Sequence, residues 1–555
     1  MQMTGAEVMV RVLAEEGVTH IFGYPGGAIL PFYDALRESN IKHILTAHEQ
    51  GAAHAADGFA RASGKVGVCV ATSGPGATNL VTGLATAFLD SIPVVAITGQ
   101  VQRSMIGHDA FQEVDITGIT MPITKHNFLI KNPQNLPRVM RLAFQLAKEG
   151  RPGPVLIDVP RDVQTALIDY VPDKLNDLPP RIPNAEGVAA AIEAINKSER
   201  PVMLIGGGVI NANAEYDVMH LCEKLHMPVV STLMGLGAIS AYRSLFLGMT
   251  GLHGHERANN AIKNADLILA VGSRFNDRVT GERTSYSANK IIIHLDIDPA
   301  EVGKNIESDI GITGNMNLTL NLLEKGTKTH DLSAWWEQIA KWPGVDEDFG
   351  DEEAPRFFSA LNPVIKDKDY IITTDVGQHQ MWAAQHVKIQ FARQWITSGG
   401  LGTMGFGLPA AMGAQFARPK SRVISLSGDG GFKMTGSELF TVATNKLPII
   451  SVVFNNSGLG MIRQLQTVQF DKRFTACEMP GYVDFVKYAE AFGIKGEHVS
   501  TPDELAAAVT RGMELNEPYV IEVAVNPKDM VLPMVAPGLG ISDYVKFAEE
   551  PEEDE

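Results

Sequence analysis

Short apolar runs rich in β-branched residues alternate with helix-forming stretches along almost the whole chain. VGVCVAT, PVVAITG and PVLIDVP occur in the first third, PVMLIGGGVI and ADLILAVG in the second, and RVISLSG and PIISVVFNN in the last. Runs of this kind, separated by helical segments, are typical of parallel sheets with crossover helices. The alternation therefore predicts an α/β fold.

The apolar runs fall into three groups separated by polar connectors. The chain has 555 residues, which is too long for a single hydrophobic core. We predict three consecutive domains, each a mostly parallel sheet flanked by helices. Their expected bounds are 1–168, 188–345 and 359–540, with linkers at 169–187 and 346–358 and an acidic, disordered tail at 541–555.

Composition excludes several classes of function. A net charge of −17 argues against a nucleic-acid partner, which would require a basic face. Cys69, Cys222 and Cys477 are too scattered for a disulfide framework or a zinc site. The N-terminal segment lacks a signal pattern, and no apolar run reaches the roughly 18 residues of a membrane span. We expect a cytoplasmic protein without a membrane partner.

The strongest chemical signal lies in the third group of runs. Asp429 in SGDGG and Asn456 in VVFNN each follow an apolar strand pattern, and a helical segment connects them. Carboxyl ends of neighbouring parallel strands meet at one edge of a sheet, where ligands bind. A carboxylate and an amide oxygen there suit Mg²⁺, whose remaining ligands can be phosphate oxygens. We interpret the pair as a metal–diphosphate anchor; the alternative is a tight turn and a capped strand end.

This Gly-Asp-Gly to Asn-Asn spacing resembles the motif of thiamine-diphosphate enzymes. Further stretches are similar to the catalytic subunits of acetohydroxyacid (acetolactate) synthases, from FGYPGGAI to NPKDMVLPMVAPG. They include HEQGAAHAADGFAR, TSGPGATNL, GSRFNDRVTG, DVGQHQMWAAQ and SGGLGTMGFGLPAAMGA. The resemblance covers nearly the whole chain and implies a three-domain thiamine-diphosphate enzyme.

The resemblance implies a set of residues that bind thiamine diphosphate and Mg²⁺. Asp429, Asn456 and Gly458 correspond to the metal ligands. The expected cofactor-binding residues are Val376, Gly377, Gln378, His379, Gly402, Met404, Gly428, Asp429, Gly430, Gly431, Asn456, Gly458, Gly460 and Met461. Met404 matches the bulky side chain that separates the two cofactor rings; the alternative is an ordinary core methionine.

Glu49 matches the glutamate that activates the cofactor by sharing a proton with N1′ of its pyrimidine ring. The alternative is a helix N-cap or first-turn acid, worth roughly 0.5–1 kcal/mol. Small residues after Glu49 would let another backbone pack closely. In the family the pyrimidine and the diphosphate contact different subunits, so the resemblance implies a homodimer or homotetramer with active sites at the dimer interface.

Five residues are expected at the substrate end of the site. Gly26 would present a backbone N–H near the reacting carbon, and Gln112 matches a polar residue that faces it. Arg278 matches the arginine that holds the carboxylate of the second substrate. Two positions depart from the family pattern: Leu465 replaces a tryptophan, and Arg161 replaces a lysine.

The middle group of runs resembles the family's FAD site, in which FAD performs no net redox step. The alternative is a plain structural α/β layer. The residues expected to contact FAD are Arg151, Gly206, Gly207, Gly208, Thr232, Leu233, Gly251, Leu252, His253, Gly272, Arg274, Arg278, Asp296, Ile297 and Asn315. Asn276 stands where an aspartate is more usual.

The expected reaction is decarboxylation of pyruvate and transfer of the hydroxyethyl unit to a second 2-ketoacid. Pyruvate gives 2-acetolactate and 2-ketobutyrate gives 2-aceto-2-hydroxybutyrate, the first common step of branched-chain amino acid biosynthesis. Alternatives are a thiamine- and FAD-dependent pyruvate oxidase, another thiamine-dependent 2-ketoacid carboligase, or a non-catalytic scaffold. The preference between 2-ketoacids, inhibitor sensitivity, dimer versus tetramer, and a separate small regulatory subunit with valine feedback stay open.

Overall fold

The computed structural model describes residues 1–176, 178–344, 353–479, 481–536 and 538–545. Those residues form three six-stranded parallel sheets and one two-stranded antiparallel sheet. This arrangement confirms the predicted α/β fold. Most of the linker predicted at 346–358, and the tail from 546 on, lie outside the described residues. The domain bounds predicted from the sequence stay a prediction.

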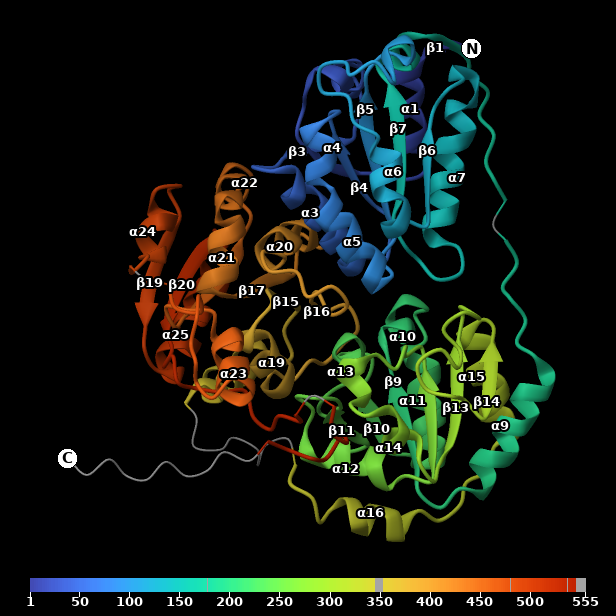
Figure 1. Ribbon diagram of the computed structural model, residues 1–555, viewed down its shortest axis with the longest axis vertical. Helices are drawn as coiled ribbons and strands as arrows, with labels where there is room; N and C mark the ends of the chain where they lie inside the picture. Colours follow the sequence, from blue (N-terminus) through green and yellow to red (C-terminus); the bar gives the residue numbers. More distant parts are fainter. Residues whose placement is uncertain (177, 345–352, 480, 537, 546–555) are drawn as a thin grey trace.

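The first sheet lies near the N-terminus, in blue and teal in Figure 1. Its order is β3 (Lys42–Leu45), β2 (His20–Gly23), β4 (Gly67–Ala71), β5 (Val94–Gln100), β7 (Val155–Pro160) and β6 (His126–Leu129). The main helices around it are α1 (Gly5–Glu15), α2 (Leu30–Leu36), α3 (Glu49–Ser63), α5 (Val81–Asp90) and α7 (Leu136–Lys148). Strands β4, β5 and β7 are buried throughout, as expected for a sheet covered on both faces.

The middle sheet, in green in Figure 1, follows a long connector. Between Asp169 and Ala185 the described residues form no helix or strand. The order is β11 (Phe246–Met249), β10 (Val229–Ser231), β9 (Pro201–Ile205), β12 (Leu267–Val271), β13 (Ile291–Asp296) and β14 (Ile310–Thr313). Helices α9 (Ala185–Lys197), α11 (Glu215–Leu225), α12 (Glu256–Asn264) and α15 (Met316–Gly326) pack around this sheet.

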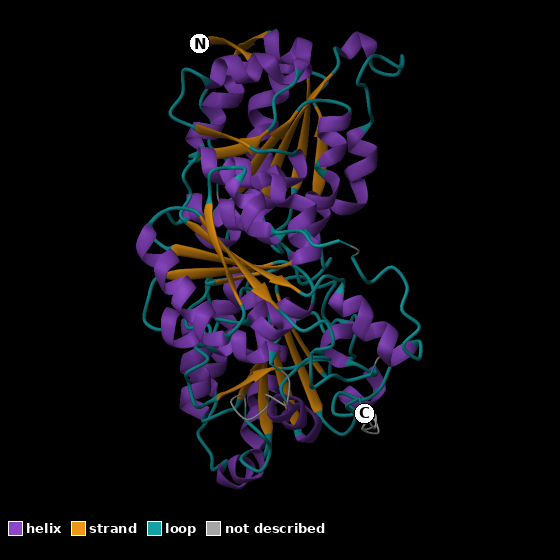
Figure 2. Cartoon of the chain, turned by 90° about the vertical axis from the view of Figure 1, so that its left-hand side faces the viewer, coloured by secondary structure: helices purple, strands orange, loops and turns teal. Residues whose placement is uncertain are grey.

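The third sheet, in gold to red, carries the segments with the strongest chemical signal. Its order is β16 (Trp395–Ile396), β15 (Tyr370–Thr374), β17 (Arg422–Gly428), β18 (Ile449–Asn455), β20 (Tyr519–Ala524) and β19 (Lys495–Val499). Its helices include α19 (Gln378–His386), α20 (Gly407–Ala417), α21 (Asp429–Thr435), α23 (Gly460–Gln469), α24 (Phe485–Glu490) and α25 (Pro502–Leu515). Figure 2 shows all three sheets enclosed by helices.

Helices α3 and α20 join the first and third domains at the centre of the molecule (Figure 1). A Cβ on Gly413 would overlap the carbonyl oxygen of Ala55, and one on Gly58 would overlap that of Ala410. The two backbones therefore touch directly, as the small residues after Glu49 predict. The backbone that packs closely against α3 is that of α20 in the same chain.

Among the described helices, none is long and apolar enough to cross a membrane.

Candidate functional site

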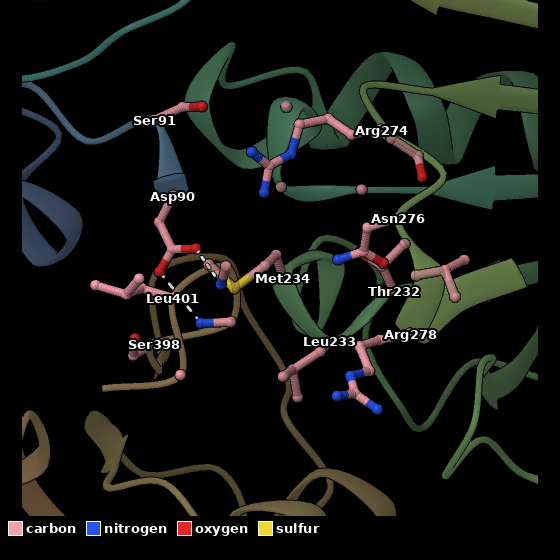
Figure 3. A pocket seen from close by; sticks show the side chains of 18 of the residues that line it. Asp90, Ser91, Thr232, Leu233, Met234, Arg274, Asn276, Arg278, Ser398 and Leu401 are labelled. Carbon is pink, nitrogen blue, oxygen red and sulfur yellow. Dashed lines mark hydrogen bonds between the residues drawn. The ribbon is translucent and has the colours of Figure 1, made fainter. Parts of the chain in front are cut away.

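A cavity of about 1260 Å³ lies where the three domains meet. Figure 3 shows Asp90 of the first domain, Arg274 and Arg278 of the middle domain and Leu401 of the third around the same space. The loops that follow β9, β12, β15 and β17 all contribute to its wall. Carboxyl ends of parallel strands are the usual ligand-binding edge of such sheets, and the cavity is the best candidate for a cofactor site.

Most of the residues predicted from the sequence line this one cavity. From the third domain they are Val376, Gly377, Gln378, His379, Gly402, Met404, Gly428, Asp429, Gly430, Gly431, Asn456, Gly458, Gly460, Met461 and Leu465. From the other domains they are Arg151, Gly206, Gly207, Gly208, Thr232, Leu233, Leu252, His253, Gly272, Arg274, Arg278, Asp296, Ile297 and Asn315. Glu49, Gly26, Gln112, Arg161 and Gly251 are not part of its lining.

Asp429 and Asn456 lie at the ends of adjacent strands, as their spacing predicts. Asp429 follows β17 and begins α21, and Asn456 follows the paired strand β18. The N–H of Gly458 donates to Asp429 Oδ2 at 3.1 Å and to Asn456 Oδ1 at 3.2 Å, so these two oxygens converge. Burial raises the pKa of the Asp429 carboxyl to about 6. Converging, hard oxygen ligands in a buried site fit Mg²⁺.

His379 lies in the wall next to Gly428 and leaves one ring nitrogen without a partner. Its Nε2 is buried and has no hydrogen bond to any described residue. Burial lowers the pKa of this imidazole to about 3, so the ring is neutral. A buried polar atom without a partner favours a bound ligand at this point. The free ring nitrogen can therefore form a hydrogen bond to a ligand such as a diphosphate.

The turn that follows Met404 is held by a buried carboxylate that the sequence did not reveal. Asp375 Oδ2 accepts the backbone N–H of Gly405 at 2.9 Å and that of Gly407 at 3.0 Å. These two bonds fix the turn that follows Met404, which contains a left-handed residue at Gly405. Asp375 lies in the DVGQHQ segment, whose position after a strand was the available signal.

The part of the cavity formed by the middle domain contains Arg274, which Asp90, Glu301 and Asp296 attract electrostatically. The Arg274 guanidinium is half-buried, and it has no ion pair or side-chain hydrogen bond to a described residue (Figure 3). Burial lowers the pKa of this guanidinium. Arg151, in contrast, forms an ion pair with Glu301 at 2.7 Å. A half-buried arginine beside a glycine-rich loop suits a phosphate-bearing ligand.

Glu49 lies in the first domain, at the start of α3. The N-cap of that helix is His48, whose Nδ1 accepts the N–H of Gln50 at 3.0 Å. The alternative of Glu49 as the N-cap is therefore wrong, although it is a first-turn acid. Its Oε2 accepts a hydrogen bond from Asn79 Nδ2 at 2.9 Å, and the side chain is half-buried.

Gly26 and Gln112 lie around the same loop, Thr72–Gly76. A Cβ on Gly26 would lie 2.5 Å from Thr72 Cγ2, and one on Gly76 would lie 3.2 Å from Glu49 Oε1. The Cβ of Gln112 would lie 2.9 Å from one on Gly74, and Gln112 has a φ of 60°, which side-chain-bearing residues rarely adopt. The structure thus groups three predicted catalytic residues, Glu49, Gly26 and Gln112, apart from the cavity lining. Arg161 is exposed at the start of helix Arg161–Thr165.

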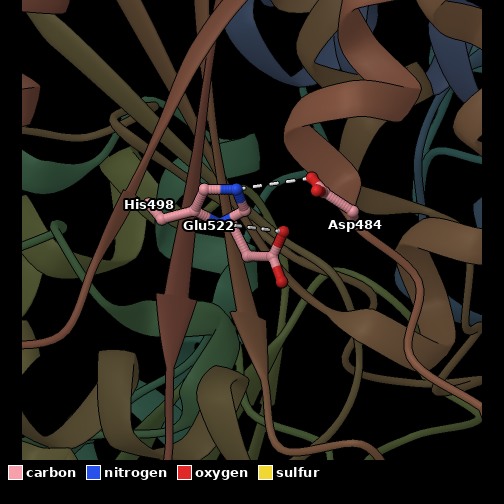
Figure 4. A group of neighbouring side chains, drawn as sticks. All are labelled: Asp484, His498 and Glu522. Carbon is pink, nitrogen blue, oxygen red and sulfur yellow. Dashed lines mark ion pairs between the residues drawn. The ribbon is translucent and has the colours of Figure 1, made fainter.

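A cluster of titratable residues, Asp484, His498 and Glu522, lies at one place in the third domain (Figure 4). His498 lies between two carboxylates, with Nε2 3.4 Å from Asp484 Oδ1 and Nδ1 3.5 Å from Glu522 Oε2. Glu522 also accepts a hydrogen bond from Asn455 Nδ2 at 2.7 Å. Glu522 thus links His498 to Asn455, the residue immediately before Asn456. The sequence did not reveal it.

Three family models match successive parts of the chain. They describe the N-terminal TPP binding domain, the central domain and the C-terminal TPP binding domain of thiamine pyrophosphate enzymes, at residues 3–119, 188–323 and 375–523. The fold and the cavity thus define a thiamine pyrophosphate enzyme.

Full-length relatives define the family within this class. A probable acetolactate synthase large subunit of Methanocaldococcus jannaschii is 47% identical, over 98% of this chain and 95% of the relative. Acetolactate synthase isozyme 2 large subunit of Escherichia coli is 45% identical, over 98% of this chain and 100% of the relative. The acetolactate synthase large subunit of Corynebacterium glutamicum is 45% identical, over 98% of this chain and 90% of the relative. The chain belongs to the family of acetolactate synthase large subunits.

Proposed function

We propose that this chain is an acetolactate synthase that joins two 2-ketoacids with loss of CO₂. Pyruvate supplies a two-carbon unit; a second pyruvate accepts it to give 2-acetolactate, or 2-ketobutyrate accepts it to give 2-aceto-2-hydroxybutyrate. These products begin branched-chain amino acid biosynthesis. The observation that carries the proposal is the convergence of Asp429 and Asn456 on the N–H of Gly458, beside Met404, in a chain of this family.

Thiamine diphosphate, when bound, supplies a carbon centre that can stabilise the negative charge left by decarboxylation. Asp429, Asn456 and the carbonyl of Gly458 would hold Mg²⁺ against its diphosphate. Met404, which precedes the turn that Asp375 holds, would separate its two rings. Glu49 would hold the proton at N1′ of the pyrimidine.

The residues expected at the reacting carbon come from two places in the structure. Gly26 and Gln112 lie with Glu49, whereas Arg278 and Leu465 line the cavity. Because one chain keeps Glu49 apart from the cavity lining, a second chain would complete each site. This arrangement supports a homodimer or homotetramer with active sites at the interface. The relatives' designation as large subunits supports a separate small regulatory subunit. A cytoplasmic location stays a proposal.

The reaction is tested with purified protein, thiamine diphosphate, Mg²⁺ and FAD in a mixture of pyruvate and 2-ketobutyrate. We expect CO₂ release and both acetohydroxyacids. Anaerobic bleaching of the flavin by pyruvate at the rate of turnover would instead assign the chain to pyruvate oxidases. Absence of thiamine-dependent CO₂ release would contradict any catalytic role.

FAD fits the part of the cavity around Arg274, whose guanidinium, without an ion pair among the described residues, would meet a diphosphate oxygen. Hydrogen bonds to charged groups contribute about 1.5–3 kcal/mol, so we expect Arg274→Gln to weaken FAD binding on the order of 10- to 100-fold. Flavin absorbance after dialysis measures the retained FAD. Arg243→Gln is the control, because Arg243 is an exposed middle-domain arginine paired with Glu223. Equal FAD retention in both variants would place FAD elsewhere.

Leu465 is expected to widen the acceptor pocket relative to tryptophan-bearing relatives. It lines the cavity from helix α23, four residues after Met461. We expect Leu465→Trp to raise the ratio of 2-aceto-2-hydroxybutyrate to 2-acetolactate by about 10- to 200-fold, the range given by small changes in apolar pockets. The same variant should gain inhibition by flat sulfonylurea-type compounds. Product ratios and inhibition curves that match those of the unaltered protein would contradict both expectations.

A further inference from the structure

The carboxylate of Glu438, in the third domain, forms hydrogen bonds with the first domain of the same chain. Glu438 ends the short turn Gly436–Glu438 and is 1% exposed. Its Oε2 accepts the backbone N–H of Ala47 at 3.0 Å, and its Oε1 accepts that of His48 at 3.1 Å. These are the two residues immediately before Glu49. One buried side chain therefore satisfies both amides at the point where α3 begins.

Gly51 allows this approach. A Cβ on Gly51 would overlap Oε1 of Glu438, so a side chain at this position and the Glu438 carboxylate exclude each other. Thr441 supports the carboxylate from its own domain, with its hydroxyl 2.8 Å from Glu438 Oε2 and 3.2 Å from the carbonyl oxygen of Leu45. The segment that leads into α3, Leu45–His48, is thus held to the third domain by three hydrogen bonds.

We propose that Glu438 is a positioning residue for Glu49: it fixes the Ala47–His48 amides so that α3 directs the Glu49 carboxylate at its target proton. The proposal rests on the proposed function, which gives Glu49 its role. The side chain of Glu49 has one hydrogen bond to a described residue, from Asn79, so its direction depends on the backbone that carries it. Displacement of a catalytic group by about 1 Å can slow a reaction by about 10²-fold.

The same segment links Asp429 and the start of α3 within one chain, although in the proposed dimer they would serve different active sites. Asp429 begins α21, and Glu438 ends the turn that directly follows that helix. The metal-binding end of the third domain and the segment that leads into α3 are therefore attached to one short, continuous element.

Glu438→Gln tests the proposal in the holoenzyme. The glutamine keeps the volume but presents an NH₂ group to one of the two amides. We expect hydrogen exchange at C2 of bound thiamine diphosphate, and kcat, to fall about 10- to 100-fold, while cofactor affinity and the KM for pyruvate change less than about threefold. In the cofactor-free protein, the amides of Ala47 and His48 should lose protection from hydrogen exchange.

Asp266→Asn is a matched control. Asp266 also accepts two consecutive backbone amides, from Glu199 and Arg200 at 2.8 and 3.0 Å, and it is not part of the cavity lining. The exchange rate at C2 should be unaffected by this control. If Glu438→Gln gives too little folded protein, Thr441→Val removes only one neighbour of the carboxylate, and a smaller loss of exchange is expected.

The double variant that combines Glu438→Gln with Glu49→Gln tests whether Glu438 acts through Glu49. If Glu438 acts through Glu49, Glu438→Gln has no further effect on C2 exchange once Glu49 is replaced. The proposal would be overturned if Glu438→Gln lowered the C2 exchange rate by the same factor in the Glu49→Gln variant as in the wild type. It would also be overturned if Glu438→Gln alone left the C2 exchange rate unaltered. An unaltered rate in Glu49→Gln alone would overturn the role of Glu49 itself, and that result identifies the proposed function as the step that failed.

Discussion

Replacement of Glu49 by glutamine should slow hydrogen exchange at C2 of bound thiamine diphosphate by about 10² to 10⁴-fold, the usual contribution of a positioned acid–base group. The amide keeps the shape of the side chain and can still accept from Asn79, but it cannot exchange a proton with N1′. Folding and diphosphate binding should change little, because Glu49 is half-buried and is not part of the cavity lining. NMR of the quenched cofactor measures the exchange rate.

The control for Glu49→Gln is Glu215→Gln. Glu215 is also the half-buried first residue of a helix, α11, so its replacement removes the same favourable charge at a helix N-terminus. That interaction contributes about 0.3–1 kcal/mol. If Glu49 only stabilises its helix, both variants lower the thermal unfolding temperature alike and leave C2 exchange intact. Such a result would return Glu49 to the role of a first-turn acid.

The sequence predicts that Asp429 and Asn456 lie close together, because each follows a strand whose pattern is local in the sequence. Asp429 and Asn456 each follow an apolar strand run, and a crossover helix between two such runs makes them neighbours in a parallel sheet. The pairing of β17 with β18 then brings the two oxygens to one point without any long-range information. Glu49 and Met404 were assigned by resemblance, since a lone glutamate or methionine carries no such pattern.

The side chains that hold these residues in place were not predictable in the same way. Glu438 contacts Ala47 across 391 positions in the chain, and Asp90 accepts the N–H of Gly400 across 310. Neither contact leaves a periodicity or a spacing in the sequence. The N-cap of α3 was not predictable either. His48 caps the helix with a ring nitrogen, although Ser, Thr, Asp and Asn are the usual N-cap residues.

Asp429→Asn should abolish most of the Mg²⁺-dependent binding of thiamine diphosphate. The variant keeps the volume of the side chain but removes its charge, and the attraction between unit charges about 4 Å apart near a protein surface is about 4 kcal/mol. We therefore expect cofactor affinity to fall on the order of 10²- to 10³-fold, measured by calorimetric titration at fixed Mg²⁺. Retained FAD would show an intact middle domain. Asp266→Asn is again the control, since that carboxylate also accepts two backbone amides.

Unfolding measurements in the absence of metal distinguish a variant that has lost a metal ligand from one whose fold is destabilised. Burial raises the pKa of Asp429 to about 6 in the folded chain, against 3.8 for an ordinary aspartate. The folded state therefore binds this proton more tightly than the unfolded state, and the stability contributed by the protonated carboxyl is lost as the pH rises from about 4 through about 6. At pH 8 the cation-free wild type carries a buried charge that the D429N variant lacks, so the variant should unfold at an equal or higher temperature. Weaker cofactor binding together with undiminished stability would mark Asp429 as a ligand, whereas a large drop in stability at pH 8 would mark it as a structural residue.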